Sequence, residues 1–270
     1  MVADAAAIAR DVLAALDAGR QLAPFARRID GFDLAAAYRV TMELRRLRVA
    51  RGERTVGRKI GFTNRGIWDE YGVFDPIWGD MWDTTVHDVA PGGAIAVSHL
   101  PEPRIEPEIV LCLDRDLDAG MSVAEVAGSV AWVAHGFEIV QSIFPDWKFA
   151  AADCIANGGL HGALHVGPRR LLAADERAEL PEMLARLKLT LSRNGEPVDA
   201  GTGANVLDGP VEALAHLVGV LAADPVNPPL RAGEIVTTGT VTRAFPVAPG
   251  ERWSTTISGF DLPGLSVEIR

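Results

Sequence analysis

RIEPEIVLCL, residues 104–113, is the stretch that decides how this chain is expected to fold. It has the apolar content of a buried β-strand, yet it carries Glu106 and Glu108 two positions apart, with Pro107 between them. Side chains alternate between the faces of a strand, so both carboxylates point the same way, about 6.5–7 Å apart at the backbone. Pro107 places the start of the strand at a sheet edge or a strand beginning. The spacing alone is compatible with a solvated strand face or with a site that uses both groups.

A third carboxylate, Glu138, stands alone in the apolar run VAHGFEIVQSIF (133–144). A carboxylate in such a run is expected to be buried, and a buried carboxylate needs a partner. The partner is either an Arg or a metal ion shared with Glu106 and Glu108. Three carboxylates without a Cys or His pair form a donor set for a hard cation, Mg²⁺ or else Mn²⁺ or Ca²⁺, completed by water or substrate oxygens. A metal open on one side is a catalytic arrangement.

Composition and charge exclude some partners. The chain has 270 residues and a net charge of −10, so we expect no nucleic-acid partner, because phosphate binding needs a basic surface. The two cysteines, Cys112 and Cys154, have no zinc-type spacing and are too few for a disulfide framework, which predicts a cytoplasmic location. Charged residues interrupt the apolar N-terminus, which therefore does not resemble a signal peptide. No run of about 18–20 uncharged apolar residues occurs, so we predict no membrane contact.

Hydrophobic periodicity predicts a helical beginning and a β-rich remainder. Residues 1–55 are expected to form an N-terminal helical part, with helices in 3–18 and 31–53, and residues 56–270 a β-rich domain. An aromatic loop, NRGIWDEYGVFDPIWGDMWDTTV (64–86), lies near the start of this domain. Strands are predicted at 55–63, 94–98, 105–113, 163–167, 187–193, 234–238, 252–257 and 265–269. Helices are predicted near 123–134, 170–175, 180–186 and 209–223, with a buried strand following within 131–144.

Several motifs together resemble one enzyme family. They are VGRKIGFTNRGIWDEYGV (56–73), DPIWGDMWDTTV (75–86), PRIEPEIVLCL (103–113), AHGFEIVQS (134–142) and AADCIANGGLHGALHVG (151–167). Their order and spacing resemble the fumarylacetoacetate hydrolase superfamily, in the branch of the 2-keto-4-pentenoate hydratases and 4-oxalocrotonate decarboxylases. The resemblance implies an α+β fold, with the helical part packed on a mixed, barrel-like sheet and a site covered by the loop 62–83. It also implies a homo-oligomer.

The resemblance implies a metal site and a proton-transfer apparatus. Glu106, Glu108 and Glu138 would hold a divalent metal, usually Mg²⁺, that chelates a 2-oxo or 2-hydroxy acid through its C1 carboxylate and C2 oxygen. Lys59 matches an active-site lysine and shares a strand face with Gly57 and Gly61, which leave room beside its ammonium. Next to a metal cluster its pKa is expected to fall, so that it acts as an acid or base or holds a substrate carboxylate.

Other matched residues have structural alternatives. Asp83 is expected to act as an acid or base or to orient water, with a turn cap as the alternative. Trp82, with Trp78 and Met81, would line the pocket unless these side chains are simply core. Thr240, in TTGT (237–240), would meet a substrate carboxylate.

Two further segments contain polar residues whose roles the resemblance leaves open. Asp153 and Asn157 are expected near the site or in an Asx turn. His161 and His165 have the spacing of a helical metal pair, but the surrounding glycines favour a loop or strand.

The leading functional hypothesis is a metal-dependent hydratase of a 2-hydroxy-2,4-dienoate from aromatic-compound degradation, giving a 4-hydroxy-2-oxo acid. The alternatives within the superfamily are a 4-oxalocrotonate-type decarboxylase and an acylpyruvate C–C hydrolase, the latter because of the TTGT segment. A diacid substrate would need an additional cation, for which Arg58, Arg65 and Arg104 are the candidates. Two other readings stay open: a binding protein without catalysis, and carboxylates that are structural and ion-paired with Arg104.

Overall fold

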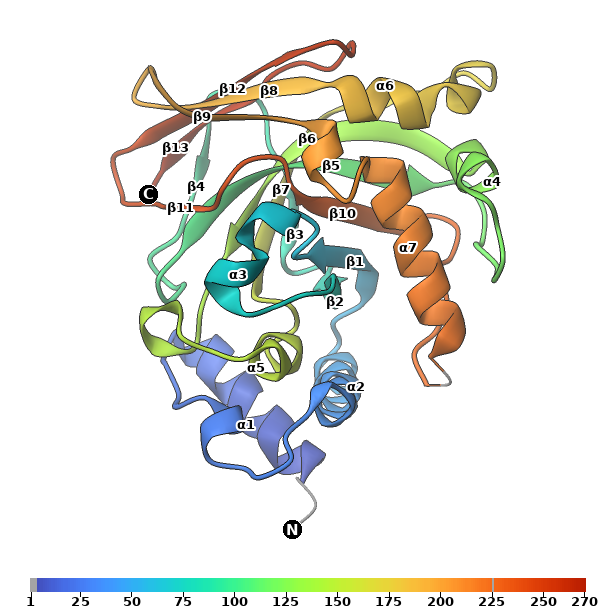
Figure 1. The fold of residues 1–270 in the computed structure, drawn as a ribbon. Coiled ribbons are helices and arrows are strands. Elements are labelled where there is room, and N and C mark those ends of the chain that lie inside the picture. The colour runs from blue at the N-terminus through green and yellow to red at the C-terminus, as the bar shows by residue number, and fades with distance from the viewer. Residues whose placement is uncertain (1–3, 225) are drawn as a thin grey trace.

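The computed structural model describes residues 4–224 and 226–270 of the chain. Helices α1 (Ala5–Ala18), α2 (Leu34–Ala50) and α5 (Ala151–Ala156) lie together at one end of the molecule, below a β-rich body that carries further helices (Figure 1). The architecture is the α+β arrangement expected from the sequence.

Capping residues and a shared apolar cluster fix the N-terminal helices. Asp4 accepts a hydrogen bond from the Ala7 amide at the start of α1, and Asp33 accepts one from the Ala36 amide at the start of α2. Gly19 ends α1 in the left-handed conformation. The buried faces of both helices pack in one cluster with residues of α5 and its flanks, among them Ile8, Val12, Val40, Leu44, Phe25, Phe144 and Ile155. Since this cluster joins the helices to the later chain, a domain boundary at residue 55 stays a prediction.

The first sheet has eight strands and is mixed. Its strands are β1 (Thr55–Gly61), β2 (Ile77–Trp82), β3 (Val86–Asp88), β5 (Arg104–Leu113), β6 (Val130–Val140), β7 (His161–Leu171), β10 (Ile235–Thr240) and β11 (Phe245–Pro246). The order is β2–β1–β10–β5–β6–β7–β3, and β11 pairs with β5. The pairs β1–β10 and β3–β7 are parallel, whereas β5 is antiparallel to both β10 and β6. The sheet is curled, as Figure 1 shows.

The second sheet has five strands and packs with three helices over the first. Its order is β4 (Gly93–Ile95), β13 (Ser266–Ile269), β12 (Arg252–Ser258), β8 (Lys188–Arg193) and β9 (Glu196–Thr202). The helices are α4 (Val123–Gly128), α6 (Leu180–Arg186) and α7 (Pro210–Ala223). The main core contains residues from both sheets and from these helices.

The alternation expected for RIEPEIVLCL is present in β5. Ile109, Leu111 and Leu113 belong to the main core, while Val110 and Cys112 belong to a separate small cluster on the other face. Glu106 and Glu108 share this second face. The strand therefore separates a purely apolar side from a side that carries the acidic groups.

Some predicted elements are wrong. The helix expected at 123–134 ends at Gly128, and β6 follows at once. Because almost every residue of β6 is buried, its sequence lacks the alternation of apolar and polar residues that would distinguish a strand from a helix. No helix forms at 170–175, because β7 continues to Leu171 in pairing with β6. The aromatic loop contains β2, whose six residues are all buried. The short elements α3 (Trp68–Tyr71), α5, β3, β9 and β11 were not anticipated.

One described segment, Gly203–Ala223, is long and apolar enough, by length and composition alone, to cross a membrane. Half of the most apolar 18-residue stretch within this segment is buried inside the protein. Helix α7, which forms most of it, packs in the main core through Val211, Leu214, Leu217 and Leu221. A core helix passes the same test of length and composition, and the packing of α7 is that of a core helix.

Candidate metal centre and substrate pocket

A pocket of about 670 Å³, part of it open to solvent, lies where β1, β5 and β10 come together. Lys59, Glu106 and Glu108 form part of its lining. Its other lining residues come from the strand ends and neighbouring loops: Ile60, Gly61, Phe62, Thr63, Asn64, Ile67, Arg104, Val140, Trp147, Gly159, Leu160, Gly239, Thr240, Arg243 and Ala244.

Strand register gathers the three predicted carboxylates. Glu106 and Glu138 are direct partners across the antiparallel pair β5–β6, and Glu108 lies two residues further along the same face of β5. Each of the three offers a carboxylate oxygen, and these atoms all lie within 4.8 Å of one another. Glu108 and Glu138 are fully buried, whereas Glu106 is half-buried and borders the pocket. The predicted proximity of the three residues is confirmed.

Nearby donors satisfy most of these carboxylate oxygens. Lys59 donates from Nζ to Oε2 of Glu138 (3.0 Å), and Nδ1 of His161 lies 2.8 Å from Oε1 of the same residue. The amide of Gly239 donates to Oε2 of Glu108 (2.9 Å). Oε1 of Glu108 is buried and has no hydrogen-bond partner in the described part of the chain.

Burial and Lys59 set the charge state of the cluster. Burial raises the pKa of Glu106 to about 7, against the opposing effect of the Lys59 ammonium. Burial, and then the charge of Glu138, raise the pKa of Glu108 as well. Burial also acts to raise the pKa of Glu138, but Lys59 and His161 outweigh it and lower that pKa to about 2. Burial acts to lower the pKa of Lys59, yet the three carboxylates outweigh it, so this pKa rises instead of falling as the sequence suggested.

The donor set fits a divalent cation. Three ionised carboxylates beside one ammonium leave a buried net charge of −2, which low-dielectric surroundings disfavour. A divalent ion cancels this charge, and the unpaired Oε1 of Glu108 is the kind of oxygen that a hard cation binds. Protons would leave Glu106 and Glu108 on binding, because metal ligands must be deprotonated.

Two glycine turns shape the space around the lysine and Glu108. Gly159, in a left-handed turn, leaves room for Lys59: a Cβ there would lie 2.7 Å from Cδ of Lys59. Gly239 has φ +104° at an irregularity in the β10–β5 pairing and turns its amide toward Glu108. Gly61 borders the Lys59 ammonium, as expected, whereas Gly57 instead allows close contact with the backbone of Ile235.

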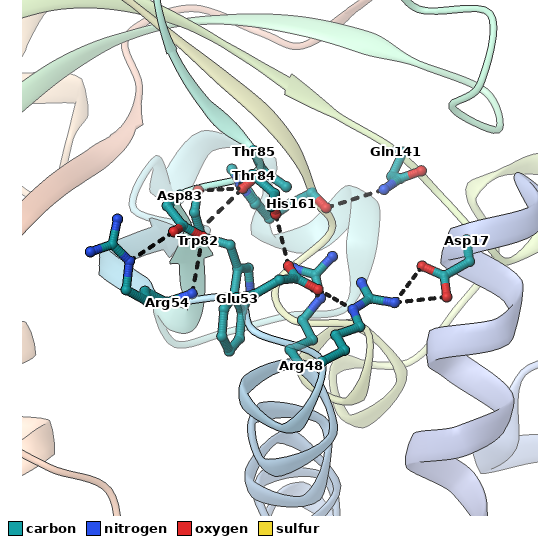
Figure 2. A network of polar contacts seen from close by, with 11 residues as sticks. Asp17, Arg48, Glu53, Arg54, Trp82, Asp83, Thr84, Thr85, Gln141 and His161 are labelled. Carbon is teal, nitrogen blue, oxygen red and sulfur yellow. Dashed lines mark hydrogen bonds and ion pairs between the residues drawn. The ribbon is translucent and has the colours of Figure 1, made fainter.

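Two predicted site residues lie away from the pocket. Asp83, after the end of β2, accepts hydrogen bonds from the amide and Nε of Arg54 at the surface (Figure 2). Trp82 is buried, with the guanidinium of Arg48 over its ring. Neither is among the described residues that line the pocket. The alternative given for Asp83 was a cap of a helix or turn; the contact found is instead with Arg54, which is 29 residues away in the chain.

Trp78 and Met81 are core residues and not pocket walls. Trp78 stacks on Tyr38, with ring centroids 5.2 Å apart, and Met81 belongs to the small cluster on the acidic face of β5. Thr240 does line the pocket, and its buried hydroxyl finds no partner among the residues described.

Of the three candidate arginines, one lines the pocket and two lie elsewhere. Arg58 is buried against Asp80, and Arg65 pairs with Asp208 at the surface, so neither serves the pocket. Arg104 lines the pocket together with Arg243, which the sequence analysis did not consider. Arg243 follows the TTGT segment by three residues, and this position beside a candidate substrate-binding threonine was the available signal.

The segment after β6 supplies a residue with a structural role and a histidine that forms a hydrogen bond with Glu138. Asp153 accepts hydrogen bonds from the amides of Phe25, Ala26 and Ala150, so it anchors the start of α5. Asn157 is buried, and its side-chain oxygen and nitrogen have no hydrogen-bond partner among the described residues. His161 and His165 lie on strand β7, as the flanking glycines indicated. The contact from His161 to Glu138 was not foreseen, because nothing in the sequence reports the β6–β7 register.

Comparison with known proteins agrees with this geometry. Residues 84–263 match the family model described as fumarylacetoacetate (FAA) hydrolase C-terminal. The chain is 32% identical to a 2-hydroxyhexa-2,4-dienoate hydratase of Comamonas testosteroni, covering 91% of this chain and 90% of that one. It is 31% identical to a 2-keto-4-pentenoate hydratase of Paraburkholderia xenovorans strain LB400, covering 93% and 90%.

Solved structures resemble it as well. A 4-oxalocrotonate decarboxylase from Pseudomonas putida G7, complexed with magnesium and adipate, superposes with a TM-score of 0.89 at 28% identity, covering 98% of this chain and 97% of that one. A fumarylpyruvate hydrolase from Pseudomonas aeruginosa, in complex with Mn²⁺ and pyruvate, has a TM-score of 0.59 at 18% identity, over 80% of this chain and 89% of that one, and shares the fold.

Proposed function

Because the chain belongs to the fumarylacetoacetate hydrolase family, we propose that it is a divalent-metal-dependent hydratase. Its reaction adds water to a 2-hydroxy-2,4-dienoate and gives a 4-hydroxy-2-oxo acid, a step in the degradation of aromatic compounds. The observation that carries the proposal is the convergence of Glu106, Glu108 and Glu138 beside Lys59 at the wall of one pocket. The identity to hydratases over nine-tenths of the chain supports the reaction type.

Glu106, Glu108 and Glu138 are proposed to hold the metal, and Mg²⁺ is the ion we assign. When bound, the metal would supply a Lewis acid that polarises the 2-hydroxy or 2-oxo acid and draws electron density from its conjugated chain. The open side of Glu106 faces the pocket, which leaves that direction to the substrate.

Lys59 is proposed to manage protons at the conjugated carbons. Its ammonium is buried and fixed by Glu138, so it holds one position beside the pocket. Ketonisation of the dienol delivers a proton to C5, and water addition then forms the C4–O bond while C3 gains a proton. Lys59 can deliver and recover a proton along this path, provided that metal binding counters the carboxylates that now raise its pKa.

Thr240 is proposed to bind the substrate. Its hydroxyl is buried at the pocket and lacks a partner among the described residues, so a substrate carboxylate or the attacking water gives it a hydrogen bond that the protein itself does not. Asp83 has no part in this proposal, because it lies at the surface with Arg54. We also propose that the protein works in the cytoplasm as a homo-oligomer.

The direct test is turnover of 2-hydroxypenta-2,4-dienoate by the purified protein with Mg²⁺. Loss of the diene absorbance and NMR detection of 4-hydroxy-2-oxopentanoate are the expected result. EDTA should stop the reaction, and added Mg²⁺ should restore it. If the dienoate stays unhydrated in the presence of Mg²⁺, Mn²⁺ and Ca²⁺, the hydratase proposal fails.

Decarboxylation of a 4-oxalocrotonate-type diacid is the second candidate, and the two pocket arginines favour it. Arg104 and Arg243 line the pocket that Lys59, Glu106 and Glu108 also line, and a cationic group there suits a second substrate carboxylate. The structural similarity to a decarboxylase complexed with adipate, itself a diacid, supports the same reading. Release of CO₂ from 4-oxalocrotonate, faster than hydration of the dienoate, would favour this candidate.

A further inference from the structure

The carboxylate of Glu138 is held from two sides by residues with different exposure to the pocket. Oε2 receives a hydrogen bond from Lys59, which lines the pocket, and Oε1 contacts His161, which does not. His161 is buried, and its other ring nitrogen, Nε2, lies 2.8 Å from the hydroxyl of Thr85. The histidine therefore touches Glu138 and Thr85 but not the space that a substrate would occupy.

The hydrogen-bonding groups define one consistent arrangement of protons. An ionised carboxylate only accepts, so Nδ1 of His161 carries a hydrogen and donates it to Glu138. In the neutral ring Nε2 then accepts, and the hydroxyl of Thr85 is its donor. The same hydroxyl oxygen accepts from the amide of Trp82 at 3.2 Å. Its single hydrogen has two acceptors within reach, the carbonyl of Trp82 at 3.2 Å and Nε2 of His161 at 2.8 Å, and we assign it to the shorter contact with His161.

Thr85 is itself held by the turn that follows β2. Its carbonyl accepts a hydrogen bond from the amide of Leu164 (2.8 Å). Its neighbour Thr84 donates to the buried carboxylate of Glu53 (2.8 Å), which is also ion-paired with Arg48 (Figure 2). Backbone and side-chain contacts thus fix the position of Thr85, so that its hydroxyl can orient the imidazole.

We propose that His161 and Thr85 are positioning residues that fix the carboxylate of Glu138 in its metal-binding orientation. The inference rests on the proposed metal site and adds two residues to it. Without the Nδ1 donor, Oε1 of Glu138 is buried and unpaired, and its carboxylate can rotate away from Glu106 and Glu108. Partners of this kind, behind the ligands, typically contribute 10- to 100-fold to metal affinity.

The test measures binding of Mn²⁺ alone to metal-free protein, by electron paramagnetic resonance or titration calorimetry, without substrate. His161→Leu should raise the dissociation constant roughly 10- to 100-fold. His161→Asn is smaller than histidine but can place its amide NH₂ donor near the Nδ1 position, so it should stay within a few-fold of wild type. Thr85→Val should weaken binding, and Thr85→Ser should not.

His165→Leu is the matched control, because His165 lies on the same strand, four residues further on, but pairs its ring with His87, 5.4 Å away between centroids. It should leave the Mn²⁺ affinity unchanged. Circular dichroism in EDTA establishes that each variant is folded, and the Thr85 pair gives the answer if His161→Leu is not.

Three results would overturn the inference. Unchanged Mn²⁺ affinity in folded His161→Leu and Thr85→Val contradicts it directly. An equal loss in His165→Leu shows general distortion of β7 instead. Wild-type protein that binds no Mn²⁺ removes the metal site together with the inference. Failure of the hydratase assay is a separate outcome, since binding without turnover leaves the positioning role intact.

Discussion

Glu106 and Glu138 face each other directly across the antiparallel strands β5 and β6. Like charges in such a cross-strand position are destabilising unless a positive charge lies between or beside them. Lys59, on strand β1, supplies one positive charge through its contact with Glu138. When Glu106 and Glu108 are ionised, their two charges have no further cation to balance them, and this is the physical reason to expect a divalent cation at this point of the sheet.

Removal of a ligand carboxylate should abolish catalysis by preventing metal binding. Glu106→Gln and Glu138→Gln keep side-chain size but offer a weaker, neutral ligand. We expect kcat/KM to fall roughly 10³-fold or more, equivalent to several kcal/mol of lost transition-state stabilisation. Calorimetric titration with Mg²⁺ should detect no binding in the same variants. Wild-type turnover in either variant would show that the carboxylates are structural. Asp83→Asn is the control and should leave kcat/KM close to wild type, because Asp83 contacts only Arg54 among the described side chains.

Mg²⁺ should restore part of the stability that is lost when the buried Lys59 is replaced. Lys59→Met removes one partner of a buried ion pair and leaves the carboxylates without compensation, which costs about 3–5 kcal/mol in the free energy of unfolding. In EDTA the loss should be largest, and saturating Mg²⁺ should restore part of it while activity stays absent. Chemical denaturation with and without Mg²⁺ measures both values. Lys148→Met, at an exposed ion pair, should change stability by less than about 1 kcal/mol. An equal loss in both media would argue against a metal at this cluster.

The stability of the metal-free protein should decrease as the pH rises from about 4.5 to about 7. Burial raises the pKa of Glu106 from 4.5 to about 7 in the folded state, so the folded chain keeps a proton that the unfolded chain releases. The free energy of unfolding therefore falls with rising pH across this window. Affinity for Mg²⁺ should rise over the same window, because the ion and the proton compete for the carboxylate. Glu106→Gln should flatten the stability slope, and an unchanged slope would contradict the assignment.

Gly239 should tolerate no side chain. An added Cβ would lie 1.8 Å from Oγ1 of Thr63, and its φ of +104° is unfavourable for any other residue. Gly239→Ala should therefore destabilise the protein by more than the roughly 1 kcal/mol expected from φ alone, and it should weaken Mg²⁺ binding by moving the amide that holds Glu108. Gly250→Ala has a similar φ of +90° with open space around it, so only the backbone cost applies. Similar losses in the two variants would remove the argument from close packing.

The pocket arginines should distinguish diacid from monoacid substrates. Arg243→Gln should raise KM for 4-oxalocrotonate roughly tenfold or more, which corresponds to one lost charged hydrogen bond. KM for the monoacid dienoate should change little. Arg252→Gln, an exposed site on β12, is the control. Equal effects on both substrates would show that Arg243 does not meet a distal carboxylate.

The carboxylate cluster was predictable because its signals are local. Alternation placed Glu106 and Glu108 on one face of β5, and the apolar surroundings of Glu138 showed that it needed a partner. The identity of that partner was not local, since His161 reaches Glu138 only through the β6–β7 pairing. For Asp83 the motif matched in sequence order, but the structure places its carboxylate on Arg54, away from the pocket.

The elements of the fold, too, were predictable where their signals are local and not where burial in the assembled sheet decides. Amphipathic helices α1 and α2 and the alternating strand β5 carry a period that can be read directly. Strands β2 and β6 are buried on both faces, so their sequences do not distinguish strand from loop or helix. Tertiary burial, which only the assembled sheet provides, decided these segments.

The raised pKa values of Glu106 and Glu108 bear on how the enzyme matures in a cell. Protons can occupy these carboxylates while Lys59 neutralises Glu138, so the newly made chain has a charge-balanced interior before it meets any ion. Folding then need not wait for metal supply. Loading becomes a later exchange in which protons leave Glu106 and Glu108 as the ion enters.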